Sequence, residues 1–160
     1  MKFIRKYFWY LPTVIWMVVI FNMSGQVGRI SSGLSLQVTE KIVDVIETVR
    51  NGDEYDRIYL TQKLHPYVRK LAHMTEYGIL YTLLFLSFFA SVIATRAMVY
   101  SILVSFLYAC SDEFHQTFVS MRSGQFADMC IDMTGVLAAV TLSLIIYSTW
   151  QKHTGAGQSE

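Results

Sequence analysis

The chain has 160 residues, of which 53% are hydrophobic and only 16% are charged, and its formal net charge is +1. Because a soluble domain has roughly 25% charged residues, this chain has too few to cover a water-exposed surface. The near-neutral charge argues against a nucleic-acid partner, since nucleic-acid-binding domains carry basic patches or stripes. The mean hydropathy of +0.37 and the long apolar runs favour an integral membrane protein.

The first apolar segment runs from Tyr7 to Phe21 and is followed by more polar residues up to Ser24. A signal peptide would have the same basic start and apolar middle, but no A-x-A-like cleavage site follows this segment. We therefore expect a retained membrane helix. Pro12 lies in its interior, and membrane helices tolerate such a proline better than soluble helices do.

The connection over residues 25–70 is polar and carries charges of both signs. Its first half contains an amphipathic stripe that predicts a helix, formed by Leu36, Ile42, Val43, Ile46 and Val49. Thr39 or Ser35 is expected to cap this helix. A turn is predicted at residues 51–53, and a second broken stripe follows over residues 59–71. Two interpretations stay open: the two helices lie on the membrane surface, or they form a lid over a site.

Three further apolar segments approach the length that spans a membrane, which is about 20 helical residues. They run over residues 71–95, from residue 97 through Cys110 to about residue 118, and over residues 127–150. The predicted fold class is therefore all-α and integral to the membrane, with four transmembrane helices and an amphipathic helical loop between the first two. We expect a single domain over residues 1–150, followed by a short polar tail at 151–160.

Four spans would place both chain ends on one side of the membrane. Lys2, Arg5 and Lys6 precede the first helix, and basic residues flank the cytoplasmic ends of membrane helices. The long polar connection also carries basic residues, but the first helix usually dominates orientation. We therefore predict an N-in, C-in topology.

Polar side chains of several predicted helices fall at one level. Counted at 1.5 Å per residue from Arg96, Glu76 lies about 30 Å and Asp112 about 24 Å along their helices. Counted from Lys152, Asp132 lies about 30 Å along the last helix. These lengths are close to the roughly 30 Å thickness of the hydrocarbon slab. Because a charge at the membrane centre costs roughly 3 kcal/mol, we expect these groups to meet one another at a membrane edge.

Helical spacing places the candidate residues on shared faces. Arg69, His73 and Glu76 are spaced i, i+4, i+7 on the second predicted span. The last turns of the third predicted span carry a dense polar cluster, formed by Asp112, Glu113, His115 and Gln116.

The fourth predicted span has small residues four positions apart, Gly135 and Ala139. This spacing is typical of a tight helix crossing in a membrane. Such a crossing would hold Asp128 and Asp132 against a neighbouring helix.

Several kinds of chemistry suit this group of side chains. General acid and base catalysis is one, and its candidate residues are His73, Glu76, Asp112, Glu113 and His115. A divalent metal ion bound through some of the same histidines and carboxylates is another. A third is binding of an anionic group by Arg69, Lys70 and Arg122. The other candidate ligand-binding residues are Gln116, Asp128 and Asp132, and the two aspartates would hold the basic side chains. The remaining interpretation is a structural network of ion pairs that holds the helices together.

The polar residues resemble the motifs of the VanZ-like family of membrane proteins. The second-helix motif is represented here by Arg69-Lys70-x-x-His73-x-x-Glu76-Tyr77. The motif between the third and fourth helices is represented by Asp112-Glu113-x-His115-Gln116-x-Phe118, with Arg122, Asp128, Asp132 and Gly135 after it. The residues Phe21-Asn22-Met23-Ser24-Gly25-Gln26 are similar to the weaker ending of the family's first helix. The chain departs from the family at Ser120-Met121, where Pro-Gly is usual, and at Ala139, where glycine is frequent.

The resemblance implies a multi-pass protein of the bacterial cytoplasmic (inner) membrane. The family's namesake is linked to resistance to the glycopeptide teicoplanin. From the residues and the resemblance together, we expect a polar pocket at the outer membrane edge that binds or processes an anionic cell-envelope component. The partner would be a membrane lipid or a lipid-linked envelope precursor. Two alternatives stay open: a metal-assisted hydrolase or transferase acting on a lipid headgroup or phosphate ester, and a non-catalytic membrane adaptor.

Overall fold

The computed structural model describes residues 7–25, 28–50, 53–119 and 126–154. This part of the chain forms helices and no strand, which confirms the all-α class. The helices, in chain order, are α2 (Tyr10–Ser24), α3 (Gly28–Arg50), α4 (Glu54–Phe89), α5 (Ala94–Gln116) and α6 (Phe126–Thr154).

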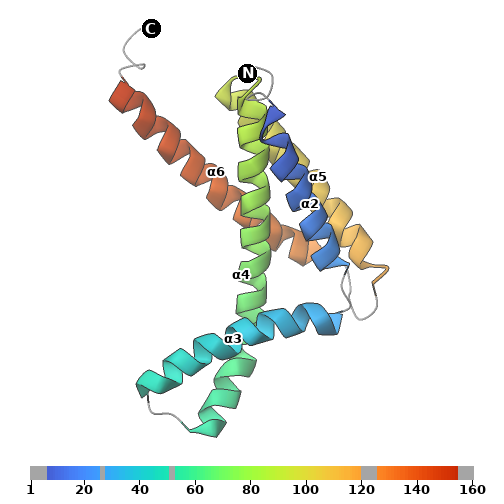
Figure 1. Ribbon diagram of the computed structural model, residues 1–160, viewed down its shortest axis with the longest axis vertical. Helices are drawn as coiled ribbons and strands as arrows, with labels where there is room; N and C mark the ends of the chain where they lie inside the picture. The colour runs from blue at the N-terminus through green and yellow to red at the C-terminus, as the bar shows by residue number, and fades with distance from the viewer. Residues whose placement is uncertain (1–6, 26–27, 51–52, 120–125, 155–160) are drawn as a thin grey trace.

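Helix α4 is the central element of the molecule. Figure 1 shows α2 and α5 along one side of α4, while α6 crosses α4 and then diverges from it. Helix α3 crosses α4 near one end of the bundle, where the end of α2 and the start of α6 also lie (Figure 1). Helix α4 contributes more side chains to the core cluster than any other helix, namely Tyr77, Leu80, Tyr81 and Leu84.

Two helices within the described residues are long and apolar enough to cross a membrane, over Ala94–Gln116 and Phe126–His153. Helix α2 is apolar but shorter. By length and composition the structure therefore shows two candidate spans rather than clearly four. This result is consistent with a membrane protein.

The predicted amphipathic segment at residues 59–71 and the predicted second span form one continuous helix, α4. The expected boundary near residue 71 was wrong, because the helix runs without interruption from Glu54 to Phe89, with Pro66 inside it. Helix α4 ends at Phe89, before the expected residue 95, and α5 begins at Ala94.

The expected cap of α3 was also wrong, because this helix begins at Gly28 and its first turns precede both candidate residues. Thr39 instead donates its hydroxyl to the carbonyl of Ser35, 2.8 Å away, inside the helix. Of the predicted turn, residues 51 and 52 lie outside the described residues. Asp53 caps α4, and its side chain accepts a hydrogen bond of 2.9 Å from the Asp56 amide.

The predicted tight crossing joins α4 to α6 and is confirmed. A Cβ atom on Gly135 would overlap the Met74 backbone and lie 2.6 Å from its carbonyl carbon. A Cβ atom on Gly78 would lie 3.2 Å from the Gly135 carbonyl oxygen and 3.9 Å from the Ala139 Cβ. Because glycine lets the two backbones touch, this crossing sets where the polar middle of α4 meets the polar start of α6.

Candidate functional site

His73 joins two of the helices at the α3 end of the bundle. Its Nδ1 atom lies 3.8 Å from the Glu76 Oε2 atom, one turn along α4, and 3.7 Å from the Asp132 Oδ1 atom of α6. Asp132 is only 1% exposed, whereas the side chain of His73 is 21% exposed. The histidine thus connects a buried carboxylate to a more accessible space.

A layer of carboxylates surrounds Asp132, which interacts electrostatically with Glu76, Asp112, Glu113 and Asp128. Asp112 and Glu113 are buried on α5, whereas Asp128 is half-buried at the start of α6. Three helices therefore contribute acidic side chains to one layer, as the residue counting predicted. Gln116 donates a hydrogen bond of 3.0 Å from its Nε2 atom to the Asp112 Oδ2 atom.

Buried polar atoms in this layer lack hydrogen bonds within the described residues. They include Asp112 Oδ1, Asp132 Oδ2 and the hydroxyl of Tyr77. Tyr77 is fully buried on α4, and its hydroxyl interacts electrostatically with both aspartates. An unpaired buried polar group costs about 1–3 kcal/mol, so such groups usually have a water, proton or ligand as partner.

Tyr77 was not among the predicted site residues. A usable signal was its spacing, since it follows His73 by four positions and so shares its face of α4.

His115 does not make the same kind of contact as His73. Its ring stacks on Phe21 of α2, with centroids 4.3 Å apart and an interplanar angle of 21°. A Cβ atom on Gly25 would lie 3.2 Å from the His115 Cε1 atom, so the ends of α2 and α5 meet closely there. Within the described residues, no three or more His, Cys, Asp and Glu side chains are grouped so that they could hold a metal ion. The geometry therefore gives the metal-binding interpretation no support.

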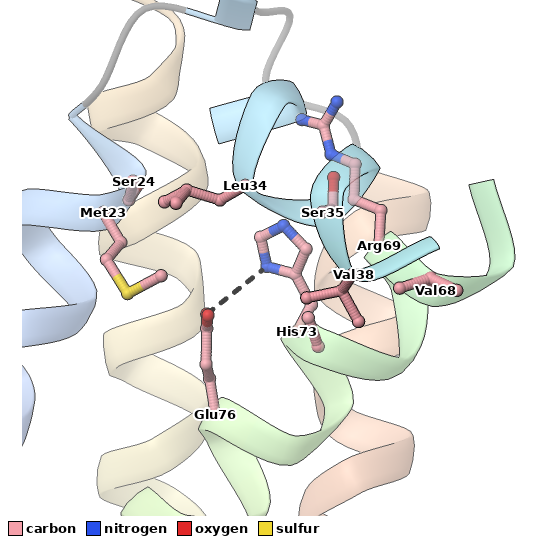
Figure 2. Close-up of a pocket in the computed structure, with 10 residues that line it drawn as sticks. Met23, Ser24, Leu34, Ser35, Val38, Val68, Arg69, His73 and Glu76 are labelled. Carbon is pink, nitrogen blue, oxygen red and sulfur yellow. Dashed lines mark ion pairs between the residues drawn. The ribbon is translucent and has the colours of Figure 1, made fainter. Parts of the chain in front are cut away.

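A cavity of about 220 Å³ opens beside His73, between the end of α2, the first half of α3 and the middle of α4. Its polar lining consists of Ser24, Ser35, Arg69, His73 and Glu76, and its apolar lining of Met23, Leu34, Val38, Val68 and Ala72. Figure 2 shows the His73 ring between Glu76 and the α3 side chains, with Arg69 on the same side of the cavity as Ser35.

Two hydroxyls of this lining differ in their pairing. The Ser24 hydroxyl is buried and has no hydrogen-bond partner among the described residues. The Ser35 hydroxyl lies 2.9 Å from the His65 Nε2 atom, which links α3 to α4. The cavity therefore offers a donor, Ser24, that the protein itself leaves unused.

The remaining predicted residues lie elsewhere. Lys70 is exposed and does not line the cavity. Arg122 lies outside the described residues. The structure thus brings together Arg69, His73 and Glu76 at the cavity, and His73 with the carboxylate layer behind it.

This arrangement can act on an anion and on protons. A guanidinium and an imidazole at one cavity supply donors for a phosphate or carboxylate. The carboxylates behind the imidazole can hold its ring and accept its proton.

A family model described as VanZ/LLP1 matches residues 9–147. No curated protein and no solved structure matches the chain. The match includes the whole of α2, α3, α4 and α5, and most of α6, so it covers the cavity and the carboxylate layer. The chain therefore belongs to the VanZ/LLP1 family, as its polar motifs predicted.

Proposed function

We propose that this protein binds an anionic component of the cell envelope in the cavity beside His73. The component would be a phospholipid headgroup or a lipid-linked precursor. The observation that carries the proposal is the lining, in which Arg69 and His73 share a cavity with aliphatic side chains. An anionic headgroup and the apolar part next to it need this combination of surfaces.

The size of the cavity limits how much of the ligand it holds. Drug-sized ligands occupy pockets of roughly 300–1,000 Å³. A cavity of about 220 Å³ is smaller, so it suits a headgroup rather than a whole lipid. The acyl chains would remain outside.

The proposal places the cavity at the outer edge of the inner membrane, in a protein with four spans and an N-in, C-in topology. Helix α4 has 36 residues and is therefore about 54 Å long, longer than the roughly 30 Å hydrocarbon slab. Its C-terminal half would span the slab beside α2, α5 and α6. Its N-terminal half, paired with α3, would lie outside.

Each charged group then has a distinct part. Arg69 and His73 would donate hydrogen bonds to the anionic group. Glu76 and Asp132 would balance the charge of a protonated His73 and hold its ring in place. Replacement of Arg69 or His73 should therefore weaken binding without leaving a void in the hydrophobic core.

Mass spectrometry of the lipids that copurify with the protein tests this proposal. We expect anionic lipids to be enriched on the wild-type protein and lost from Arg69→Gln and His73→Gln. Arg57→Gln is the matched control, because Arg57 lies on the same helix but away from the cavity, in an exposed ion pair with Asp44. Equal lipid content in all four proteins would contradict the proposal.

A link to glycopeptide resistance is part of the same proposal and is supported by family membership. It predicts that expression in a susceptible bacterial strain lowers sensitivity to teicoplanin. The Arg69→Gln variant, expressed at the same level, should not. Unchanged sensitivity with the wild-type protein would contradict the link to resistance and would leave the proposed binding function untouched.

A further inference from the structure

Helix α3 has three faces rather than two. One face packs on α4 and includes the fully buried Thr39 and Val43. A second face is polar and exposed, formed by Gln37, Glu40, Lys41, Asp44 and Thr48. The third, which we call the exposed stripe, is aliphatic and between 41% and 80% exposed, and it consists of Leu34, Val38, Ile42, Val45 and Val49. The sequence positions of the exposed stripe differ by three or four residues, so it follows one side of the helix.

The start of the exposed stripe shows which way this side points. Leu34 and Val38 line the cavity together with Met23 and Ser24, the last residues of α2. This side of α3 therefore faces the ends of the bundle helices. Beyond the crossing with α4, α3 continues past the bundle (Figure 1). Ile42, Val45 and Val49 continue the same side there and are exposed.

The polar face is anchored on another side of α3. Asp44 forms an ion pair with Arg57 of α4, with an N–O distance of 2.7 Å. An in-plane membrane helix has the same division, with aliphatic side chains toward the acyl chains and charged ones toward water.

We propose that α3 lies in the interface of the outer leaflet, with the exposed stripe against lipid, and that the cavity opens toward this leaflet. The ligand would then be an anionic amphiphile that enters from the bilayer, with its headgroup in the cavity and its chains along the stripe. The identification of the ligand rests on the function proposed above, whereas the placement of α3 does not.

The occupant of the stripe is lipid rather than another protein for two reasons. The stripe is purely aliphatic, whereas protein interfaces are enriched in aromatic residues and arginine. Its first residues also line the cavity beside the end of α2, and α2 has exposed apolar side chains of its own, among them Val14, Val18 and Phe21. Exposed apolar side chains on two neighbouring helices suit the same apolar solvent, the bilayer.

Spin labels test the placement of α3. Cys110 and Cys130 are first changed to alanine, and a label is attached at Val45→Cys or at the matched control Thr48→Cys, both on exposed positions of α3. In phosphatidylcholine vesicles we expect the label at position 45 to collide mainly with dissolved oxygen, and the label at position 48 mainly with a water-soluble nickel chelate. Equal access of the nickel chelate to both labels would overturn the placement.

Protection of a cysteine in the cavity tests the route of the ligand. Ala72 lines the cavity and is exposed, so Ala72→Cys should react with a maleimide. We expect phosphatidylglycerol in the vesicles to slow this reaction at least tenfold, and soluble glycerol phosphate to leave it unchanged. Equal protection by both would overturn entry from the bilayer while supporting an anion-binding cavity. Protection by neither would contradict the proposed function itself, whatever the spin labels show.

Discussion

The two ends of the helix bundle are built in different ways. At the end away from α3, aromatic rings pack edge to face, with Phe88 placed between Tyr10 and Tyr100 at centroid distances of 6.3 and 5.9 Å. The buried hydroxyls of Thr13 and Ser87 pair there at 3.0 Å. At the α3 end, carboxylates are crowded together and several buried oxygen atoms have no hydrogen bond within the described residues.

This difference separates stability from function. Packed rings and paired hydroxyls stabilise the fold, and they have their partners within the protein, so they need no ligand. Unpaired buried oxygen atoms cost stability, and proteins keep such groups where they serve binding or proton transfer. We therefore expect substitutions at the two ends to act on different measured quantities.

The largest loss of stability should come from a change at the α4–α6 crossing, which fixes the positions of both ends of the bundle. Gly135→Val would push a side chain into the Met74 backbone and destabilise the protein by about 3 kcal/mol or more. Thermal unfolding in detergent, followed by circular dichroism, measures this loss. Gly33→Ala is the control, because a Cβ atom there meets nothing within 4 Å, and it should leave stability equal or slightly higher. Similar losses in both variants would contradict the close α4–α6 approach.

The second effect concerns the pairing of His73. His73→Ala removes a partner of the buried Asp132 and should cost about 2 kcal/mol, in addition to the loss of bound lipid. The double variant His73→Ala with Asp132→Ala should be less destabilised than the sum of the single variants, because it leaves no buried carboxyl group without its partner. Unfolding free energies of the three variants measure this coupling, and strict additivity would rule out the ion pair.

Two tyrosines allow a direct comparison of a paired hydroxyl with an unpaired one. Tyr108 donates to the carbonyl of Met17 at 2.6 Å, so Tyr108→Phe should cost about 1 kcal/mol. The Tyr77 hydroxyl has no hydrogen bond within the described residues, so Tyr77→Phe should leave stability unchanged or raise it. If Tyr77 serves the site, its variant should nevertheless lose copurifying lipid. A Tyr77 variant as unstable as the Tyr108 variant would show that this hydroxyl has a structural partner.

The smallest effect should come from the exposed ion pair between Asp44 and Arg57, which join α3 to α4 outside the bundle. Arg57→Ala should cost less than about 0.5 kcal/mol, and high salt should abolish the difference, because water and ions screen exposed pairs. Unfolding at low and high salt tests this. A loss above about 1 kcal/mol would instead be closer to that of a buried ion pair. It would show that the pairing of α3 with α4 contributes more to stability than expected.

Much of the site was predictable because helical spacing is regular. The common face of Arg69, His73 and Glu76 follows from positions three and four apart. The crossing at Gly135 follows from small residues at such spacing. The level of Asp132 follows from the rise per residue. All three predictions concern distances along one helix or around it, and these depend on local geometry alone.

Other features required the tertiary structure, because spacing along a helix says nothing about how that helix is rotated against its neighbours. Sequence alone could not show that His73 pairs with Asp132 while His115 stacks on Phe21. Nor could it divide the aliphatic residues of α3 into a buried face and an exposed stripe, since both have helical periodicity. By itself the sequence determined an all-α chain with charged helix ends at one level and membership of the VanZ/LLP1 family. Packing decided which of those ends meet and where a cavity remains between them, because these depend on contacts between residues far apart in the chain.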